Sequence, residues 1–333
     1  MNILLSYAGD KTEMIQFFKR VLKNKEKVFA CDCELNYSLT QADGYFISPK
    51  ANDESYVSVL TDYCKKKKIT VIIPLSDADL SILSKNKNMF RDLGISVIVS
   101  SESIIDISID RWKTFLFLES IGIKQPLTHI DLEAAKRDIE TGVISFPLFL
   151  KPRYATEKTK GIDVDSLEEL DLFYSKMMHK INAPGIFRDK SIVIQEDLLG
   201  DKYSLCILND LQGDFVTAFA MQKMTISEEK TFVGQVVEIQ PFEKIIDLLS
   251  SFRLKHTACL EIDCCLQKSG EVTVTEIYAR FGQSYPFWHI AGADIPKQII
   301  QWMNGQAVSS EYINPKTGVK GCRENLLAVN FEF

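Results

Sequence analysis

Short apolar segments alternate with amphipathic ones along the first hundred residues. Runs of Ile, Leu, Val and Phe predict five buried strands, at residues 2–7, 27–31, 44–47, 69–74 and 94–99. Between them, apolar residues at helical spacing predict helices over residues 54–67 and 79–91, and a first helix for which Thr12 is the expected N-cap. This alternation predicts an open parallel sheet with helices on both faces.

The pattern changes after about residue 105. Helices are predicted over residues 110–122 and 166–180, with one apolar strand between them at residues 146–151. Six strands then follow with few helices, at residues 191–196, 203–209, 215–222, 232–238, 258–266 and 271–278. Such a succession predicts antiparallel sheets. The predicted fold class is therefore α/β plus α+β, with an amino-terminal Rossmann-like domain of parallel sheet.

A parallel sheet of this kind raises the question of dinucleotide binding. The turn after the first strand contains one glycine, Gly9, whereas a dinucleotide fingerprint needs three glycines to turn tightly, admit the phosphates and pack the helix. Asp32 ends the second strand and is placed to face a ribose, but one carboxylate alone is weak support. The sequence therefore argues against a nicotinamide-dependent enzyme.

Composition places the chain among ordinary soluble globular proteins. The 333 residues are 46% hydrophobic and 25% charged, which argues against a disordered chain or a coiled coil. The net charge of −6 does not indicate a nucleic-acid partner. No apolar run approaches the ~18–20 residues that span a bilayer, and the start lacks the basic segment of a signal peptide. We expect a cytoplasmic protein without a membrane or nucleic-acid partner.

The eight cysteines do not indicate a metal site or a disulfide framework. They form no C-x-x-C pair, and several stand inside apolar strand-like runs, as Cys206 and Cys259 do. Cysteine in such a position behaves as a small hydrophobic residue. We therefore expect reduced core cysteines, in preference to zinc binding or redox chemistry.

Two carboxylates on neighbouring predicted strands are the first candidates for chemistry. Asp263 lies on one strand and Glu276 on the next, with Lys268-Ser269-Gly270 as the hairpin between them. The two can pair across the hairpin, with Arg280 just beyond. Paired carboxylates suit Mg²⁺, which takes one or two carboxylates together with substrate phosphates. Solvated hairpins show the same pattern, and the spacing alone favours neither interpretation.

Two further segments place polar groups at the ends of apolar strands. Lys151 ends the apolar run 146–150 and is followed by a proline. This lysine is either a strand end that reaches solvent or a cation directed into a cleft. Gln195 and Glu196 end another apolar strand, shortly before Leu198 and a glycine. That segment is either a hinge that exposes backbone groups or an ordinary strand end.

Taken in order, these segments resemble the ATP-grasp superfamily, in particular the free-standing proteins similar to the large subunit of carbamoyl phosphate synthase. The resemblance covers nearly the whole chain and rests on the order and spacing of the motifs, since each motif alone is weak. The motifs are Ile72-Ile73-Pro74-Leu75, Ser76-Asp77-Ala78-Asp79, Asp110-Arg111-Trp112-Lys113-Thr114, Gly122-Ile123-Lys124-Gln125-Pro126, Lys151-Pro152, Gln195-Glu196 and Glu276-Ile277-Tyr278-Ala279-Arg280-Phe281-Gly282.

The resemblance implies a two-lobed ATP-grasp fold after the Rossmann-like domain. The implied domains are residues 1–105, a lid at 106–190 and a core with the metal site at 191–333. The implied activity is an ATP-grasp ligase: a small carboxylic acid attacks the γ-phosphate of ATP, and an amine displaces the acyl phosphate to form an amide. The implied cofactors are ATP and Mg²⁺, and the implied partners are small-molecule carboxylate and amine substrates. A homodimer is the assembly that we consider.

The family's functional residues carry over position by position. Arg111 and Lys151 match phosphate contacts, and Asp263 and Glu276 match the magnesium acids. Arg280 matches the arginine that steadies the transferred phosphoryl group, so Arg280 and Lys151 are the expected catalytic residues. The hinge residues that read adenine are Gln195, Glu196 and Leu198. The roles of two further groups stay open. Lys223 either contacts phosphate or substrate, or is a solvated strand end. Gln283, Ser284 and His289 follow the strand of the metal site, where an acceptor substrate would lie.

Three departures from the family pattern concern the ATP site. Tyr278 stands where the family has an asparagine, and a phenol is a poor magnesium ligand. The loop after Lys151 has one glycine where the family has several, although Lys158 and Lys160 offer point charges. Lys202 stands where an acid holds the ribose hydroxyls. The alternative function is therefore a degenerate member that binds nucleotide or a partner without turnover.

Overall fold

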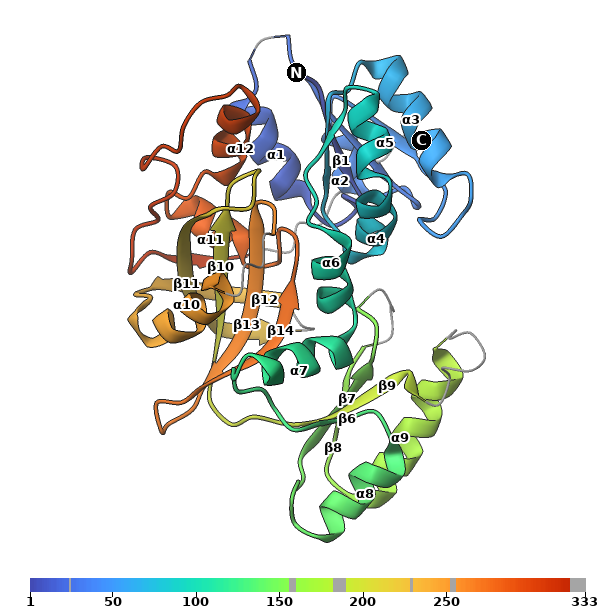
Figure 1. Ribbon diagram of the computed structural model, residues 1–333, viewed down its shortest axis with the longest axis vertical. Coiled ribbons are helices and arrows are strands. Elements are labelled where there is room, and N and C mark those ends of the chain that lie inside the picture. The colour runs from blue at the N-terminus through green and yellow to red at the C-terminus, as the bar shows by residue number, and fades with distance from the viewer. Residues whose placement is uncertain (24, 156–159, 182–189, 228–229, 252–255, 324–333) are drawn as a thin grey trace. The chain divides into compact units, whose positions relative to one another are not determined.

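The computed structural model describes all residues except 24, 156–159, 182–189, 228–229, 252–255 and 324–333 (Figure 1). It divides the chain into two compact units. Unit 1 contains Met1–Ile105, Ser204–Glu261 and Tyr278–Phe333, and unit 2 contains Asp106–Tyr203 and Ile262–Ile277. The three domain ranges drawn from the sequence stay predictions.

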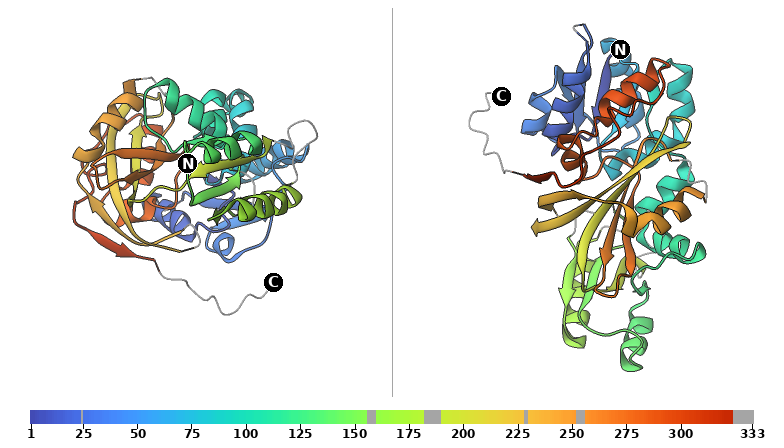
Figure 2. Two further views of the ribbon diagram at one scale, coloured as in Figure 1. Left: turned by 90° about the horizontal axis from the view of Figure 1, so that it is seen from below. Right: turned by 90° about the vertical axis from the view of Figure 1, so that its left-hand side faces the viewer.

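Unit 1 opens with the parallel sheet that the alternating pattern predicts. Its strand order is β3-β2-β1-β4-β5, and every neighbouring pair is parallel. The strands are β1 (Ile3–Ser6), β2 (Val28–Asp32), β3 (Gly44–Ile47), β4 (Val71–Pro74) and β5 (Ser96–Val97). The helices are α1 (Thr12–Val21), α2 (Tyr37–Thr40), α3 (Tyr56–Lys67), α4 (Asp77–Lys85) and α5 (Lys87–Asp92). Helices lie on both faces of this sheet (Figures 1 and 2).

Three details differ from the sequence expectation. Lys11 occupies the N-cap position of α1, and Thr12 is the first helical residue, with its Oγ1 2.8 Å from Ser38 Oγ. The single helix expected over residues 79–91 is two helices, because the backbone leaves helical geometry at Asn86 (φ −97°, ψ 7°). A helix that the pattern did not predict, α6 (Glu102–Ile109), follows β5.

A second sheet has the strand order β14-β13-β10-β11-β12-β15. Its strands are β10 (Asp201–Asn209), β11 (Phe215–Ser227), β12 (Lys230–Val237), β13 (Cys259–Leu266), β14 (Val272–Tyr278) and β15 (Lys320–Cys322). The pair β11–β12 is antiparallel, as the strand succession predicts, and β15, which the pattern did not predict, is antiparallel to β12. The associated helices are a 3-10 turn (Gln240–Phe242), α10 (Glu243–Ser251), α11 (Tyr285–Ile290) and α12 (Ile295–Met303).

The core of unit 1 joins α1 to the carboxyl-terminal helices. Phe18 of α1, Trp288 of α11 and Ile299 of α12 are fully buried in one apolar cluster, together with Ile3 and Leu5 of β1. Because side chains alternate along a strand, this cluster takes one face of the parallel sheet. Residues close to the two ends of the chain therefore stabilise the same unit.

Unit 2 holds a four-stranded antiparallel sheet in the order β6-β9-β7-β8. Its strands are β6 (Thr128–His129), β7 (Leu148–Pro152), β8 (Ile162–Val164) and β9 (Ile192–Glu196), and its helices are α7 (Arg111–Ser120), α8 (Leu132–Glu140) and α9 (Leu167–Lys180). Leu148 and Leu150 enter an apolar core with Leu170 and Met177 of α9. Strand alternation therefore directs Lys151 to the opposite face of the sheet.

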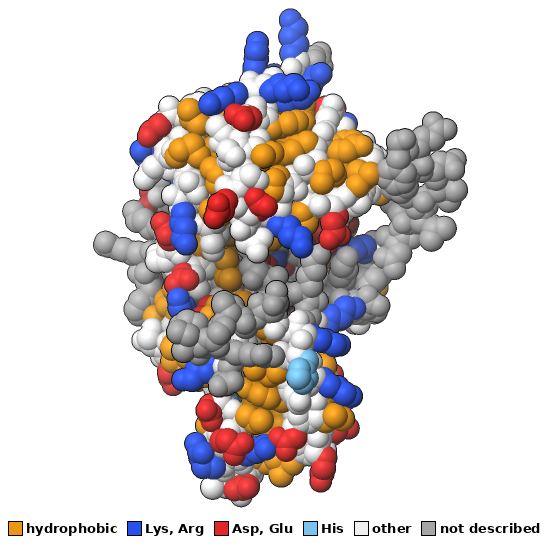
Figure 3. Space-filling model, turned by 90° about the vertical axis from the view of Figure 1, so that its right-hand side faces the viewer, with side chains coloured by type: hydrophobic (Ala, Val, Ile, Leu, Met, Phe, Trp, Pro, Cys, Tyr) orange, Lys and Arg blue, Asp and Glu red, His pale blue; other side chains and the backbone are white. Residues whose placement is uncertain are grey.

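Charged side chains of both signs are interspersed on the face drawn in Figure 3. Of the helices that the structure describes, none combines the length and apolar composition required to cross a membrane.

Candidate functional site

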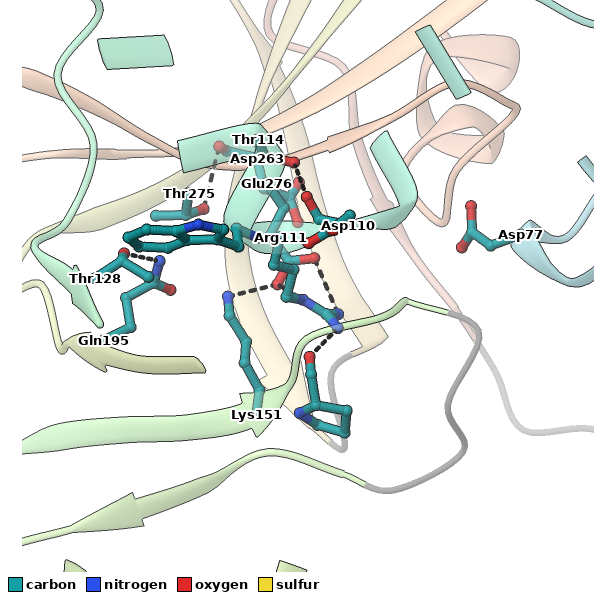
Figure 4. Close-up of polar contacts among 12 residues, drawn as sticks. Asp77, Asp110, Arg111, Thr114, Thr128, Lys151, Gln195, Asp263, Thr275 and Glu276 are labelled. Carbon is teal, nitrogen blue, oxygen red and sulfur yellow. Dashed lines mark hydrogen bonds and ion pairs between the residues drawn. The ribbon is translucent and has the colours of Figure 1, made fainter. Parts of the chain in front are cut away.

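Three charged side chains meet in unit 2. Glu276 lies on β14, Arg111 begins α7, and Lys151 lies near the end of β7. Lys151 Nζ is 2.7 Å from Glu276 Oε1, and the Arg111 guanidinium spans both carboxylate oxygens, with Nε 3.3 Å from Oε1 and Nη2 3.3 Å from Oε2 (Figure 4). One carboxylate therefore pairs with two cations.

The burial of Lys151 shows whether its side chain reaches solvent. Its residue is only 5% exposed, and an ammonium group this deep needs a counter-charge. Glu276 supplies that charge, and Arg111 is held nearby because its Nη1 donates to Pro152 O at 2.8 Å. The structure thus shows Lys151 as a buried, paired cation and not as a strand end that reaches solvent; its direction into a cleft stays a prediction.

Asp263 lies on β13, the neighbour of β14, and is partly exposed. Thr275 Oγ1 donates to the backbone oxygen of Asp263 at 3.1 Å, which ties the residue before Glu276 to this position. Two carboxylates on adjoining strands fit the donor set of Mg²⁺, which completes its shell with phosphate oxygens and water. Among the described residues, no group of three or more His, Cys, Asp or Glu side chains could hold a metal ion by itself.

The expected hinge begins at the end of β9. Gln195 pairs with Phe149 of β7, is 8% exposed, and donates Nε2 to Thr128 Oγ1 at 2.9 Å. Glu196 accepts a longer bond, 3.4 Å, from the backbone N–H of Leu127. The side chains of both hinge residues therefore have partners within unit 2.

Lys202 holds the backbone just after the hinge strand. Its Nζ donates to Leu198 O at 2.9 Å and lies 4.0 Å from Asp197 Oδ1. Leu198 itself is 7% exposed. The lysine that replaces the family's ribose acid thus fixes a hinge carbonyl group in this structure.

A small cavity lies beside the charged cluster. It is lined by Arg111, Gln195 and Glu276, together with Thr114 and Phe115 of α7. Its volume is about 10 Å³, the room of a single water molecule. An adenine ring is much larger than this cavity.

Arg280 and Lys223 belong to unit 1. Arg280 donates Nε to Asp77 Oδ1 at 2.9 Å and Nη2 to Asp77 Oδ2, and it lies 5.1 Å from the centre of the Tyr278 ring. Burial opposes the charged form, but the adjacent Asp77 outweighs it, so the pKa of Arg280 is raised. Lys223 lies on β11 opposite Gly234 of β12. Arg280 is thus a buried, paired cation.

We expect Arg280→Lys to keep the charge but lose the two-pronged contact with Asp77. A hydrogen bond to a charged group contributes about 2 kcal/mol, so the free energy of unfolding should fall by roughly that amount. Urea denaturation of the variant and of the exposed control Lys268→Arg measures the difference. An unchanged midpoint for Arg280→Lys would contradict the stabilising role of the paired contact.

The segment after β14 is held by contacts inside unit 1. Arg323 donates Nη1 to Gln283 Oε1 and Nη2 to Gln283 O, both at 2.9 Å. Ser284 is fully buried. The His289 ring stacks on Phe17 with 3.6 Å between ring centres, and burial lowers the pKa of His289. The substrate-binding role considered for these three residues stays a prediction.

Sequence reasoning missed two acids that hold cations. Asp77 pairs with Arg280, and Asp110 pairs with Arg153. The available signal was their position, since Asp110 is the N-cap of α7 and Asp77 lies in the first turn of α4. Of the lysines considered in the loop after β7, Lys158 lies outside the described residues.

Comparison with known proteins agrees with the resemblance. Residues 3–98 match the family described as PylC-like, N-terminal domain. A stretch of 116 residues, 33% of this chain, is 27% identical to the carbamoyl phosphate synthase large chain of Helicobacter pylori. That stretch covers 11% of the relative, so this chain corresponds to a small part of it.

Solved structures extend the likeness to nearly the whole chain. The biotin carboxylase domain of 2-oxoglutarate carboxylase from Hydrogenobacter thermophilus, in complex with MgADP, ADP and bicarbonate, matches with a TM-score of 0.71 at 14% identity, over 96% of this chain and 73% of that one. Carboxyaminoimidazole ribonucleotide synthase from Aspergillus clavatus, complexed with ATP, matches with a TM-score of 0.72 at 11% identity, over 95% and 79%. At these identities the likeness shows the fold, and the expected two-lobed ATP-grasp fold is confirmed.

Proposed function

We propose that this chain is an ATP-grasp ligase that joins a small carboxylic acid to an amine at the expense of ATP. The carboxylate attacks the γ-phosphate of ATP, which releases ADP and forms an acyl phosphate. The amine then attacks the acyl carbon, and phosphate leaves as the amide forms. The identities of the acid and the amine are not part of the proposal.

The observation that carries this proposal is the charged cluster of Arg111, Lys151 and Glu276. Two cations supplied by different elements converge on one point inside unit 2, where a polyphosphate would need them. Phosphoryl transfer depends chiefly on positioning and on neutralising charge. We propose that Arg111 and Lys151 turn from Glu276 to the phosphates when the nucleotide binds, and that Lys151 also acts in catalysis.

Asp263 and Glu276 are the residues that would hold Mg²⁺. The ion would neutralise phosphate charge during transfer. Once the two cations turn to the phosphates, the Glu276 carboxylate becomes available as an oxygen ligand. The two acids lie on adjoining strands, and Mg²⁺ needs no more than two carboxylates from the protein.

We assign adenine to the hinge residues Gln195 and Glu196, which end β9, the strand paired with β7, and to Leu198, which follows it. Lys223 as a contact of phosphate or substrate, and Arg280 as the residue that steadies the transferred phosphoryl group, stay predictions from the sequence. Support comes from the two solved structures of this fold, whose ligands are MgADP in one and ATP in the other.

A second candidate is a protein that binds nucleotide or a partner without turnover. Two observations favour it. Lys202 already donates to the hinge carbonyl of Leu198, and the guanidinium of Arg280 is engaged by Asp77. Tyr278 in place of the family's asparagine adds to these.

Titration calorimetry with MgATP, followed by an assay of ADP release, distinguishes the two candidate functions. We expect binding to the wild type, weaker binding to Lys151→Met, and unchanged binding to Lys268→Met, which alters an exposed hairpin lysine. ADP release is then measured with a panel of carboxylic acids and amines. Release that needs both substrates supports the ligase; binding without release for any pair supports the second candidate. No binding of MgATP by the wild type would overturn both nucleotide-dependent functions.

A further inference from the structure

We propose that the ion pair between Asp110 and Arg153 is a positioning device for the phosphate-binding cations Arg111 and Lys151. This inference rests on the proposed function, because it assumes that these two cations receive a polyphosphate. Neither Asp110 nor Arg153 would touch the nucleotide.

The pair has two-pronged geometry. Arg153 Nε is 2.7 Å from Asp110 Oδ1, and Arg153 Nη2 is 2.7 Å from Asp110 Oδ2. The two side chains are 12% and 4% exposed respectively. The hydrogen bonds that Arg153 donates to Asp110 raise the pKa of Arg153 despite burial. Two parallel bonds fix orientation as well as distance, which one ammonium contact would not do.

Each partner is next to a cation of the charged cluster along the chain. Asp110 directly precedes Arg111 at the start of α7, and Arg153 follows Lys151 by two residues at the end of β7. A change in the distance between Asp110 and Arg153 would therefore change the distance between the two cations. Arg111 Nη1 also donates to Pro152 O, the carbonyl group between Lys151 and Arg153.

Backbone contacts reinforce the same junction. Arg111 N donates to Arg153 O at 2.9 Å, and Ala155 N donates to Ile109 O at 2.9 Å. Asp110 and Tyr154 form an isolated antiparallel bridge. These two hydrogen bonds are the ones that define the bridge, so the start of α7 is joined to the end of β7 by a backbone bridge, by the bond from Arg111 to Pro152 O and by the ion pair.

Asp110 also has a local role that must be separated from the pair. Its Oδ1 accepts bonds from Trp112 N at 3.1 Å and Lys113 N at 3.4 Å, which caps α7. An asparagine keeps such a cap but carries no charge. A buried ion pair is in general weak support for stability, so a geometric purpose explains its presence better.

The test compares binding of a nucleotide, MgATP, with binding of the nucleoside adenosine, which has no phosphates. Arg153→Gln and Asp110→Asn remove the charge of one partner each, and Arg153→Lys keeps the charge but loses the planar fork. The matched control is the exposed ion pair of Asp106 with Lys113 on the same side of α7, altered by Asp106→Asn and Lys113→Gln. Dissociation constants for MgATP and for adenosine are measured by calorimetry on each full-length variant, with thermal unfolding in parallel.

We expect the three pair variants to bind MgATP about tenfold more weakly, the size typical for loss of a supporting partner, while adenosine binding and the control variants stay unchanged. Equal MgATP affinity in Arg153→Lys, Asp110→Asn and the wild type overturns the inference. So does an equal loss for adenosine, because a merely structural defect weakens both ligands. If Arg153→Gln does not fold, the MgATP affinities of Arg153→Lys and Asp110→Asn test the inference. If the wild type binds no MgATP, the proposed function fails first, and this inference fails with it.

Discussion

Replacing Glu276 with glutamine should abolish turnover while leaving nucleotide binding intact in the absence of magnesium. Glu276 is paired with both Arg111 and Lys151, so a neutral side chain in its place frees these two cations for the phosphates. The same change removes a proposed metal ligand. Loss of one preorganised charged group at a reacting phosphate should lower the rate of ADP release about 10²- to 10³-fold.

Calorimetry with ATP and EDTA, followed by ATP and Mg²⁺, checks both halves of this expectation. In the wild type we expect affinity to depend on Mg²⁺, whereas in Glu276→Gln that dependence should largely disappear. Glu271→Gln, at the exposed hairpin before β14, is the matched control. Retained turnover in Glu276→Gln would remove this residue from the proposed metal site, and lost ATP binding would show that its charge is needed to order the two cations.

Replacing Asp79 with asparagine should remove a large pH dependence of stability. Asp79 lies in the first turn of α4, is fully buried, and accepts a 2.9 Å bond from Tyr56 Oη. Burial raises the pKa of Asp79 to about 7, against the lowering effect of the hydrogen bond that Tyr56 donates. In the unfolded chain its pKa is about 3.9.

The sign of this change in stability with pH follows from the proton bound to Asp79. Below pH 4 both states are protonated and Asp79 carries no penalty. Between about pH 4 and pH 7 the folded state keeps a proton that the unfolded state loses, so stability falls as the pH rises. At pH 8 the accumulated penalty is about 4 kcal/mol. The free energy of unfolding of Asp79→Asn, relative to the wild type, should therefore increase by about that amount from pH 4 to pH 8.

Urea denaturation followed by circular dichroism at several pH values measures this difference. Taking the variant relative to the wild type cancels the other titrating groups. Asp62→Asn, an exposed change on α3, serves as the control and should show no trend with pH. A flat difference for Asp79→Asn would mean that Asp79 is already ionised in the folded chain at neutral pH.

The sequence predicts the elements best where one face of each is buried. The apolar runs of β1, β2 and β4 predict buried strands, and these strands are buried almost throughout; β3 has an apolar run as well, but its residues are partly or largely exposed, so its expected burial is wrong. The break between α4 and α5 at Asn86 is not predicted, because it depends on a local hydrogen bond from Asn86 Nδ2 to Ile82 O at 2.8 Å. Strand β5 is shorter than the apolar run 94–99, since the chain there leaves the sheet after Val97.

For the candidate site, a charge in an unusual place was the informative signal. Lys151 stands out because it ends an apolar strand, and the structure pairs it with Glu276. The pair Asp110–Arg153 is different, since its members are 43 residues apart and neither stands in an unusual local pattern. Burial of a polar side chain such as Asp79 also cannot be deduced from spacing, because it depends on what packs above it.

The size of the cavity beside Gln195 has a consequence for measured affinities. With about 10 Å³ of space, this cavity does not hold an adenine ring, so binding of a nucleotide there would require a conformation in which its lining residues lie further apart. A competent fraction of about 1% would make the apparent dissociation constant about 100-fold larger than the intrinsic one. Substitutions that shrink the Phe115 side chain would then tighten nucleotide binding without adding any contact to it.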